Sequence, residues 1–366
     1  MYPIFYVNYN MYQFPMLENY QLVPIQFQDT SSPASTLIAS RKKQNSITPI
    51  NVETSKNISK ETSANSDVLK STENKTIELD FLTHSTDTIA SELKSMIMTT
   101  KIENIEKVFD FLSNDSNFLT LSTHYAGTRV IQDAIEYFNI QQKEKLIEIC
   151  KNEIIKYIYS KHANFVIYKL IVESNTILVE KFAGYLLQYN IKSIACDQYG
   201  CRIFRAIFQT STTETNILNL IYIIISQSQH IFNSRYGHHV ITYLITFGTI
   251  NQIMSVCTML CNDIKLYVRG NGFYIISEIF NCSIFDKYYD VIKYLAHGIL
   301  HDKYFTEIKC IEFKEYYVLN SLLDAVYYIT ELKDELITFL NTNHNTIKMS
   351  RHGKRLLEKI DKLDYI

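Results

Sequence analysis

Seven side chains with a flat charged or aromatic group recur along this chain at nearly constant spacing. The intervals between successive members are 36, 37, 37, 35, 43 and 38 residues. Each group, a ring or a guanidinium, can stack on the face of a nucleobase, whereas a surface that binds proteins would be expected to include acidic or aliphatic residues in such a column. A stacking surface for nucleobases is therefore predicted, formed by Arg129, Phe165, Arg202, His239, Tyr274 and Tyr317. Arg355, the seventh member, lies in the presumed C-terminal cap, where a solvated or capping role explains it equally well.

Each member of this column is the second residue of a five-residue motif that in most cases follows a glycine or alanine. On a helix, the first, second and fifth residues share one side, while the third and fourth, which are aliphatic or Phe, point elsewhere. The first, second and fifth residues are therefore predicted to face outward, and the third and fourth to pack in a core. Phe273 and Tyr316, both in first positions, are explained equally well by packing against an adjacent repeat. The candidates for contact with base edges are Thr128, Gln132, Asn164, Tyr168, Cys201, Arg205, His238, Thr242, Ser277 and Asn320.

The recurrence of the whole motif at this period indicates a solenoid built from one repeated helical unit. Each unit has a short apolar segment such as Ile154–Tyr159, then the motif helix, then an amphipathic helix such as Thr176–Tyr189. Only 9 Gly and 5 Pro occur among 366 residues, which is too few for a turn-rich β fold. We therefore predict an all-α fold, a curved α-solenoid.

The first 80 residues differ from the rest. They begin with aromatic residues that alternate with Asn, Gln and Pro, and continue with a stretch rich in Ser, Thr, Asn and Lys. Because such a segment buries too little apolar surface to offset the entropy of ordering, we predict a disordered low-complexity tail over 1–80. The repeat domain is predicted over 81–366, with a degenerate N-terminal cap at 85–118, six motif repeats at about 119–340 and a C-terminal cap at 341–366.

The bulk composition favours some functions and gives no support to others. The 36 basic and 38 acidic residues nearly cancel, so net charge offers no argument for nucleic-acid binding. Seven cysteines without a CxxC pair predict reduced, mostly buried thiols in an intracellular protein. The most apolar run, Ile217–Ile225, is about half the length that a bilayer requires, so we expect no membrane span.

Sequence motifs for catalysis are absent, since the chain has neither a GxxxxGK[ST] phosphate loop nor a GxSxG elbow. His297 and His301 have the spacing of a metal-binding pair, but they lack the glutamate of an HExxH motif. His238 and His239 are adjacent and so point apart on a helix. We expect a protein that is not an enzyme and that holds no metal and no cofactor.

Four motifs, in their order along the chain, resemble the first four repeats of the PUF (Pumilio-homology) family of RNA-binding proteins. They read Thr-Arg-Val-Ile-Gln from Thr128, Asn-Phe-Val-Ile-Tyr from Asn164, Cys-Arg-Ile-Phe-Arg from Cys201 and His-His-Val-Ile-Thr from His238. The segment that starts at His352 is similar to the family's terminal cap, in which a tyrosine stands at that position. The long interval before Glu315 resembles the loop that precedes the family's last repeat. The resemblance covers roughly residues 85–366.

The resemblance implies that each repeat takes one base, which the second residue stacks on and the first and fifth residues contact at the Watson–Crick edge. Thr128 with Gln132 stays near the family's pair for adenine, and Asn164 with Tyr168 keeps half of the pair for uracil. The later pairs depart from the family's patterns, which implies an altered or relaxed sequence preference. Six motif units are visible against the family's eight, so either two are missing after the unit that ends at Thr242 or one is hidden in residues 85–112.

The function that the resemblance implies first is sequence-selective binding of single-stranded RNA, expected in mRNA 3′ untranslated regions. The outcome would be repression or decay through deadenylation or translational-repression factors, by a cytoplasmic monomer. A nucleolar relative that binds ribosomal RNA during ribosome assembly is an alternative, although such proteins usually have more repeats and a more basic surface. A helical-repeat scaffold for proteins is a third possibility, which the near-neutral charge favours and the stacking column opposes.

Overall fold

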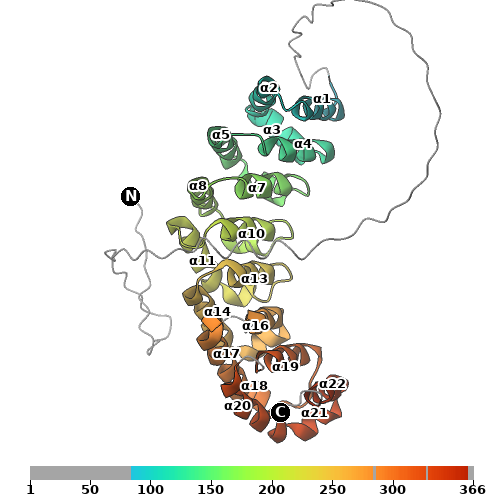
Figure 1. The fold of residues 1–366 in the computed structure, drawn as a ribbon, viewed down its shortest axis with the longest axis vertical. Coiled ribbons are helices and arrows are strands. Elements are labelled where there is room, and N and C mark those ends of the chain that lie inside the picture. Colours follow the sequence, from blue (N-terminus) through green and yellow to red (C-terminus); the bar gives the residue numbers. More distant parts are fainter. Residues whose placement is uncertain (1–83, 283–285, 327–328, 362–366) are drawn as a thin grey trace, which may run out of the picture. The chain divides into compact units, whose positions relative to one another are not determined.

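A computed structural model describes residues 84–282, 286–326 and 329–361. Within these ranges the chain folds into helices and short 3-10 turns, with no strand. The helices stack in two rows that follow a common curve, with the motif helices on the inner side and a second row on the outer side (Figure 1). The prediction of an all-α curved solenoid is confirmed, whereas the predicted tail over 1–80 lies outside the described residues.

The same three-helix unit occurs six times. The inner row is α4 (Tyr125–Ile135), α7 (Ala163–Val172), α10 (Cys201–Thr210), α13 (Gly237–Phe247), α16 (Gly272–Asn281) and α19 (Phe313–Val326). The outer row is α5 (Ile140–Lys151), α8 (Thr176–Leu186), α11 (Thr215–Ser226), α14 (Ile250–Asn262), α17 (Tyr289–His301) and α20 (Lys333–Thr342). A short helix precedes each inner helix: α3 (Asp115–Thr123), α6 (Ile154–Tyr159), α9 (Ile191–Ala195), α12 (Ser228–Ile231), α15 (Ile264–Arg269) and α18 (Lys303–Thr306).

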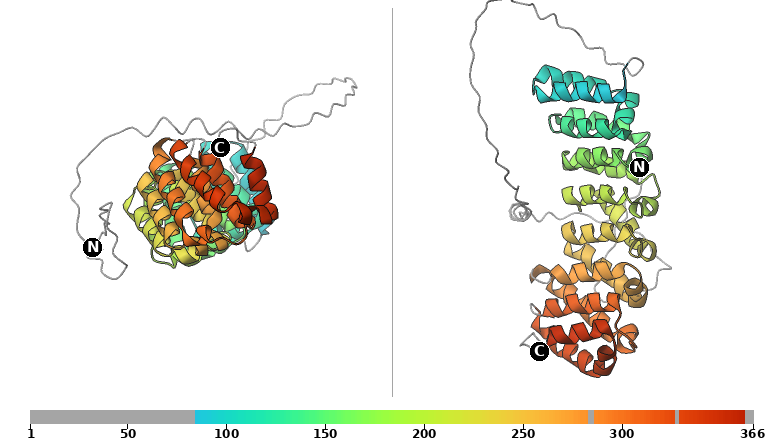
Figure 2. Two further views of the ribbon diagram at one scale, coloured as in Figure 1. Left: turned by 90° about the horizontal axis from the view of Figure 1, so that it is seen from below. Right: turned by 90° about the vertical axis from the view of Figure 1, so that its right-hand side faces the viewer.

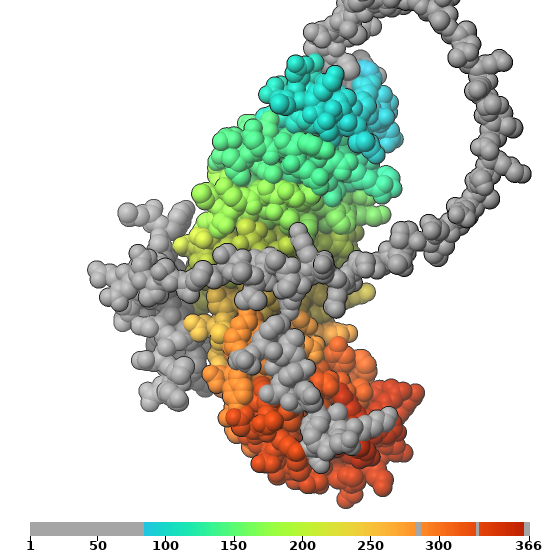
Figure 3. Space-filling view, viewed as in Figure 1, coloured from blue at the N-terminus to red at the C-terminus, as the bar shows by residue number. Residues whose placement is uncertain are grey.

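Incomplete units stand at the two ends of the stack. At the N-terminal end, α1 (Thr86–Met98) packs on α4 and heads the inner row, and α2 (Ile102–Leu112) follows it. At the C-terminal end, α21 (His344–Met349) leads into α22 (Arg351–Ile360), which packs on α19. The 3-10 turns η3 (Asp286–Tyr288) and η4 (Thr330–Leu332) precede α17 and α20. The layers succeed one another in chain order, as the right-hand view of Figure 2 and the colours of Figure 3 show.

Three of the outer helices begin at a residue whose own side chain caps them. Asn139 and Thr249 form capping boxes with Gln142 and Gln252 at the starts of α5 and α14. The Asn175 side chain accepts a hydrogen bond from the Leu178 amide at the start of α8. These side chains satisfy amides that the first turn of a helix leaves without a partner, so they help to fix where these three helices start.

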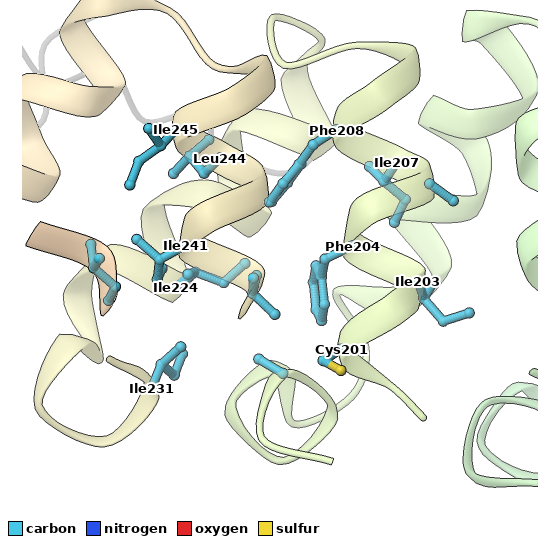
Figure 4. Packing of buried hydrophobic residues seen from close by; sticks show 14 of the residues in the cluster. Cys201, Ile203, Phe204, Ile207, Phe208, Ile224, Ile231, Ile241, Leu244 and Ile245 are labelled. Carbon is cyan, nitrogen blue, oxygen red and sulfur yellow. The ribbon is translucent and has the colours of Figure 1, made fainter. Parts of the chain in front are cut away.

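The third and fourth motif residues form the core between the rows, as predicted. In the third motif, Ile203 and Phe204 are both fully buried, and one turn further along the same helix lie Ile207 and Phe208 (Figure 4). The Phe204 and Phe208 ring centroids are 6.1 Å apart. Since each inner helix packs on the next one along the stack, this core runs continuously through the solenoid.

Polar contacts also join consecutive units. The Glu180 carboxylate of α8 accepts hydrogen bonds from the backbone amides of Asn216 (2.7 Å) and Ile217 (3.3 Å), and so caps α11 of the next unit. The Lys143 ammonium of α5 donates to the backbone carbonyl of Glu173 at 2.9 Å, beyond the end of α7. Helix ends in one unit are thus satisfied by side chains of its neighbour.

The glycine that directly precedes most of the five-residue motifs lies against the short helix of its own unit. A Cβ on Gly127 would stand 2.4 Å from the carbonyl oxygen of Leu121. A Cβ on Gly200 would stand at the same distance from the carbonyl oxygen of Ile194. Real Cβ atoms do not approach a backbone oxygen so closely. The sequence needs glycine there because the chain turns directly from one helix into the next.

Substitution Gly127→Ala is therefore expected to lower the free energy of unfolding. Overpacking against rigid backbone costs about 1–3 kcal/mol, more than the gain of about 1 kcal/mol in helix propensity. Gly184→Ala in α8 is the matched control, because its Cβ would meet only the side-chain amide of Asn216, at 3.0 Å. Urea unfolding of both variants gives the comparison, and equal effects would contradict this account of the motif glycine.

None of the described helices is long and apolar enough to cross a bilayer.

Candidate nucleic-acid interface

The planar side chains of the second motif position lie on the inner row, with their flat groups accessible. Phe165, Tyr274 and Tyr317 are 43%, 39% and 36% exposed. Arg129 and His239 are exposed, as is Arg355 in the terminal helix α22, and Arg202 is half-buried. An exposed aromatic ring or guanidinium is unusual inside the curve of a compact stack, and its accessible face is what stacking on a base requires.

In the N-terminal half of the row, aromatic rings support the arginines. The Arg129 guanidinium carbon lies 4.4 Å from the centroid of the Tyr125 ring. The Arg202 guanidinium carbon lies 5.2 Å from the Phe165 ring and 6.0 Å from the Tyr199 ring. These cation–π contacts hold the guanidinium planes in place before any ligand binds. Sequence reasoning missed Tyr125 and Tyr199, although their positions three or four residues before an arginine place them on the same helical face or the turn before it.

In the C-terminal half of the row, the rings pack on one another. His238 and Tyr274 are stacked, with centroids 4.9 Å apart and an angle of 17° between the planes. Tyr274 and Tyr317 meet edge to face at 5.9 Å, and Phe273 meets Tyr317 in the same way at 5.4 Å. The rings of neighbouring units therefore occupy part of the space between the inner helices from α13 to α19. Phe273, 2% exposed, packs against the adjacent repeat, which was one of its two predicted roles.

The first motif position does not face outward, so this part of the prediction is wrong. The side chains at this position are buried, with exposed fractions of 4% for Thr128, 0% for Asn164, 4% for Cys201 and 6% for His238. Along a helix of 3.6 residues per turn, the first residue lies about 100° from the second. The second residue therefore faces the inside of the curve, while the first turns toward the adjacent inner helix.

Most of the polar groups at the first position have partners within the protein. The Thr128 hydroxyl donates to the carbonyl of His162 in the next unit, at 3.0 Å. The Asn164 amide donates to the carbonyls of Ser160 (2.7 Å) and Lys161 (3.0 Å), which lie at the end of α6. Burial raises the pKa of the Cys201 thiol to about 11, so this group is neutral. Contact of these residues with a base edge stays a prediction.

The fifth position is more varied. Gln132, Tyr168 and Thr242 are half-buried, and Arg205 is exposed, with its guanidinium carbon 5.5 Å from the Tyr243 ring. Ser277 is buried, against the expectation that it faces outward, and its hydroxyl has no hydrogen-bond partner among the described residues.

Asn320, also at the fifth position, is held by the terminal helix. Its side-chain oxygen accepts a hydrogen bond from the Lys359 ammonium of α22 at 2.9 Å, and the same ammonium lies 2.6 Å from Asp324. This contact uses one of the two lone pairs of the Asn320 oxygen and leaves the second lone pair and the amide N–H groups for a base. The neighbouring first-position residue Tyr316 is half-buried, with its ring 5.7 Å from that of His352 in the same terminal helix.

A hollow of about 690 Å³ opens on this face between α10 and α19. Predicted site residues meet there: Arg205, His238, His239, Thr242, Tyr274, Ser277 and Tyr317 all line it. The hollow is also lined by Arg235, Tyr243 and Glu278, which could not be predicted as site residues because they lie outside the five-residue motif.

The two histidines in the hollow are neutral groups. Burial lowers the pKa of His238, and burial together with the nearby His238 lowers the pKa of His239. His238 Nδ1 lies 3.0 Å from the carbonyl oxygen of Ser234. Because a carbonyl can only accept, Nδ1 carries the proton and Nε2 is left as an acceptor. The positive charge of the hollow therefore comes from Arg205 and Arg235.

Comparison with known proteins agrees with this arrangement. The model of the Pumilio-family RNA binding repeat (PUF) matches residues 117–149 and 190–218. The search of curated proteins gives no match. Among solved structures, the chain is similar to PUF-8 in complex with PBE-RNA, at 18% identity and a TM-score of 0.64, covering 75% of this chain and 83% of that one.

Two further structures are similar at comparable levels. The RNA-binding domain of yeast Puf5p bound to SMX2 RNA has 16% identity and a TM-score of 0.60, covering 76% of this chain and 82% of that one. The Puf3 RNA binding domain bound to the Cox17 RNA 3′ UTR recognition sequence site A has 17% identity and a TM-score of 0.58, covering 75% and 84%. At these identities the likeness to solved structures concerns the fold.

Proposed function

We propose that this chain is a Pumilio-type (PUF) repeat protein that binds single-stranded RNA along the inner row of its solenoid. One observation carries the proposal: a planar side chain stands at the same position of every unit, on the inner face, with its flat group at least partly accessible. Stacking on such groups contributes roughly 1–3 kcal/mol per base. Several units that act together would therefore bind a short RNA tightly.

The two halves of the row support different contributions to binding. The cation–π contacts of Arg129, Phe165 and Arg202 use one face of each flat group, so we place a base on the other face, and the arginines add attraction to phosphates. From His238 to Tyr317 the rings already contact one another, so bases must displace these contacts or lie in the hollow beside them. We expect the N-terminal half to provide most of the stacking energy. If each unit takes one base, the RNA site is about six bases long.

The biological role that we propose is control of mRNA in the cytoplasm by a monomeric protein. The similarity to the Puf3 structure with a 3′ UTR recognition sequence supports an mRNA 3′ untranslated region as the target. Binding there would lead to repression or decay of the message, through recruited deadenylation or translational-repression factors.

Binding of ribosomal RNA in the nucleolus is the second candidate. It is favoured by the fifth motif position, because the burial of Ser277 and the Lys359 contact of Asn320 reduce the groups free to read a base edge. A protein with intact stacking groups and few edge readers would bind by the shape of the RNA more than by its sequence.

Selection of bound sequences from a random RNA pool with the full chain tests these proposals. Enrichment of a short single-stranded motif would support mRNA binding, and enrichment of structured RNA without a common motif would support the second candidate. If no RNA is enriched, RNA binding is refuted, and a protein scaffold becomes the better account.

A further inference from the structure

We propose that His297, His301 and Glu335 form a binding site for one zinc ion on the outer row of the solenoid. His297 and His301 lie one turn apart in the last part of α17, and Glu335 lies in the first turn of α20, in the next unit. One possible ligand atom from each residue lies within 4.8 Å of the other two. The site does not depend on the proposed RNA surface, because it lies on the other row of helices.

The distances are close to those of a bound ion. Zinc bonds to nitrogen and oxygen ligands of about 2.0–2.2 Å place neighbouring ligand atoms of a tetrahedron roughly 3.3–3.6 Å apart. His297 Nδ1 already lies 3.3 Å from Glu335 Oε2. The His301 ring is near the same oxygen, 3.9 Å away at Nδ1, although its other nitrogen, Nε2, would be the ligand atom. The side chains of His297, His301 and Glu335 are 61%, 58% and 33% exposed, so small rotations can bring the three ligand atoms together.

The hydrogen bonding of His301 prepares this residue to be a ligand. Its Nδ1 lies 3.0 Å from the backbone carbonyl of His297. A carbonyl can only accept, so Nδ1 carries the proton and the lone pair of Nε2 is available. Histidines that bind metals usually donate their other ring N–H to a carbonyl or carboxylate in this way, which fixes the tautomer and the orientation of the ring.

The chemistry of the ligand set favours zinc over other common ions. Two imidazoles and one carboxylate suit Zn²⁺, whereas Ca²⁺ and Mg²⁺ prefer sites made of oxygen atoms alone. Three protein ligands leave a fourth position for water. A hollow of about 400 Å³ adjoins the cluster, lined by His301, Glu335, Asp334 and Thr338 among others, and gives room for that water. No motif in one helix could reveal this site, because the third ligand comes from the next unit.

The bound ion would connect α17 to α20 and so stabilise the interface between the fifth and sixth units. Titration of the metal-free full chain with zinc chloride, followed by calorimetry, is expected to show one ion bound per chain and a higher melting temperature. His297→Ala and Glu335→Gln are each expected to weaken zinc binding at least about tenfold, because each removes a ligand. Magnesium chloride at the same concentration is expected to have no effect on the melting temperature.

Two control variants locate the ion. His344→Ala removes an exposed histidine outside the cluster, and Cys310→Ser removes an exposed thiol, so neither should change zinc affinity. Absence of saturable zinc binding would overturn the proposal. So would equal affinity of the parent chain and both ligand variants, or loss of binding on Cys310→Ser. Circular dichroism of each variant without metal confirms that a lost affinity is not a lost fold.

Discussion

Combined substitution of Arg129, Phe165 and Arg202 by alanine is expected to weaken RNA binding at least about hundredfold. The three side chains present planar groups on the inner face, and each stacked base is worth roughly 1–3 kcal/mol. A loss of even 3 kcal/mol in total exceeds a hundredfold change in affinity, since about 1.4 kcal/mol corresponds to a factor of ten. The measurement is fluorescence anisotropy with a labelled RNA from the selection.

Thermal stability should change little in this variant, because Arg129 and Phe165 are exposed. Arg202 also donates to the Asn164 side-chain oxygen at 3.5 Å, a long hydrogen bond whose loss costs about 1 kcal/mol at most. Ile177→Ala with Tyr222→Ala is the control, because both residues are exposed on the outer row. Unchanged affinity in the triple variant would rule out the inner face, and a large loss of stability would show that the three side chains serve packing.

Substitution of Phe204 by alanine is expected to lower stability and to leave RNA affinity unchanged. The expected loss in the free energy of unfolding is about 3–5 kcal/mol. Phe204 lies on α10 with its side chain fully buried in the core, so removal of the ring leaves a cavity (Figure 4). Phe165→Ala is a matched control of the same residue type in the preceding unit. Its ring is 43% exposed, and a loss within about 1 kcal/mol is expected, mainly from the contact with Arg202.

Urea unfolding followed by circular dichroism measures both variants. RNA affinity, measured where both proteins are folded, should fall for Phe165→Ala and remain close to that of the parent chain for Phe204→Ala. Equal losses of stability would mean that the second and fourth motif positions do not differ in burial as the structure describes.

The helices could be predicted from the sequence where local signals decide them. Ile154–Tyr159 is expected as a short apolar segment, and α6 has these bounds. The amphipathic helix expected over Thr176–Tyr189 begins at the same residue as α8 and runs three residues past its end at Leu186. Apolar periodicity and the motif period depend on neighbours in sequence, so they could be read without knowledge of the stack.

The candidate site could be predicted only in part, because its details depend on residues that are distant in sequence. The burial of Thr128 follows from the next inner helix, which supplies the carbonyl of His162. Asn320 is contacted by Lys359, 39 residues further along the chain. The stacking of His238 on Tyr274 likewise joins two units. A five-residue motif identifies which side of a helix its residues share, but not how closely the adjacent helix approaches that side.

The capping of α11 by Glu180 has a consequence for how the protein is made. Glu180 precedes its partner Asn216 by 36 residues, and Lys143 precedes Glu173 by 30. During translation, the residue that supplies the side chain is therefore already synthesised when the backbone that it caps leaves the ribosome. Each new unit can dock on a finished template as it emerges, so the nascent chain does not have to wait for its C-terminus before it gains structure.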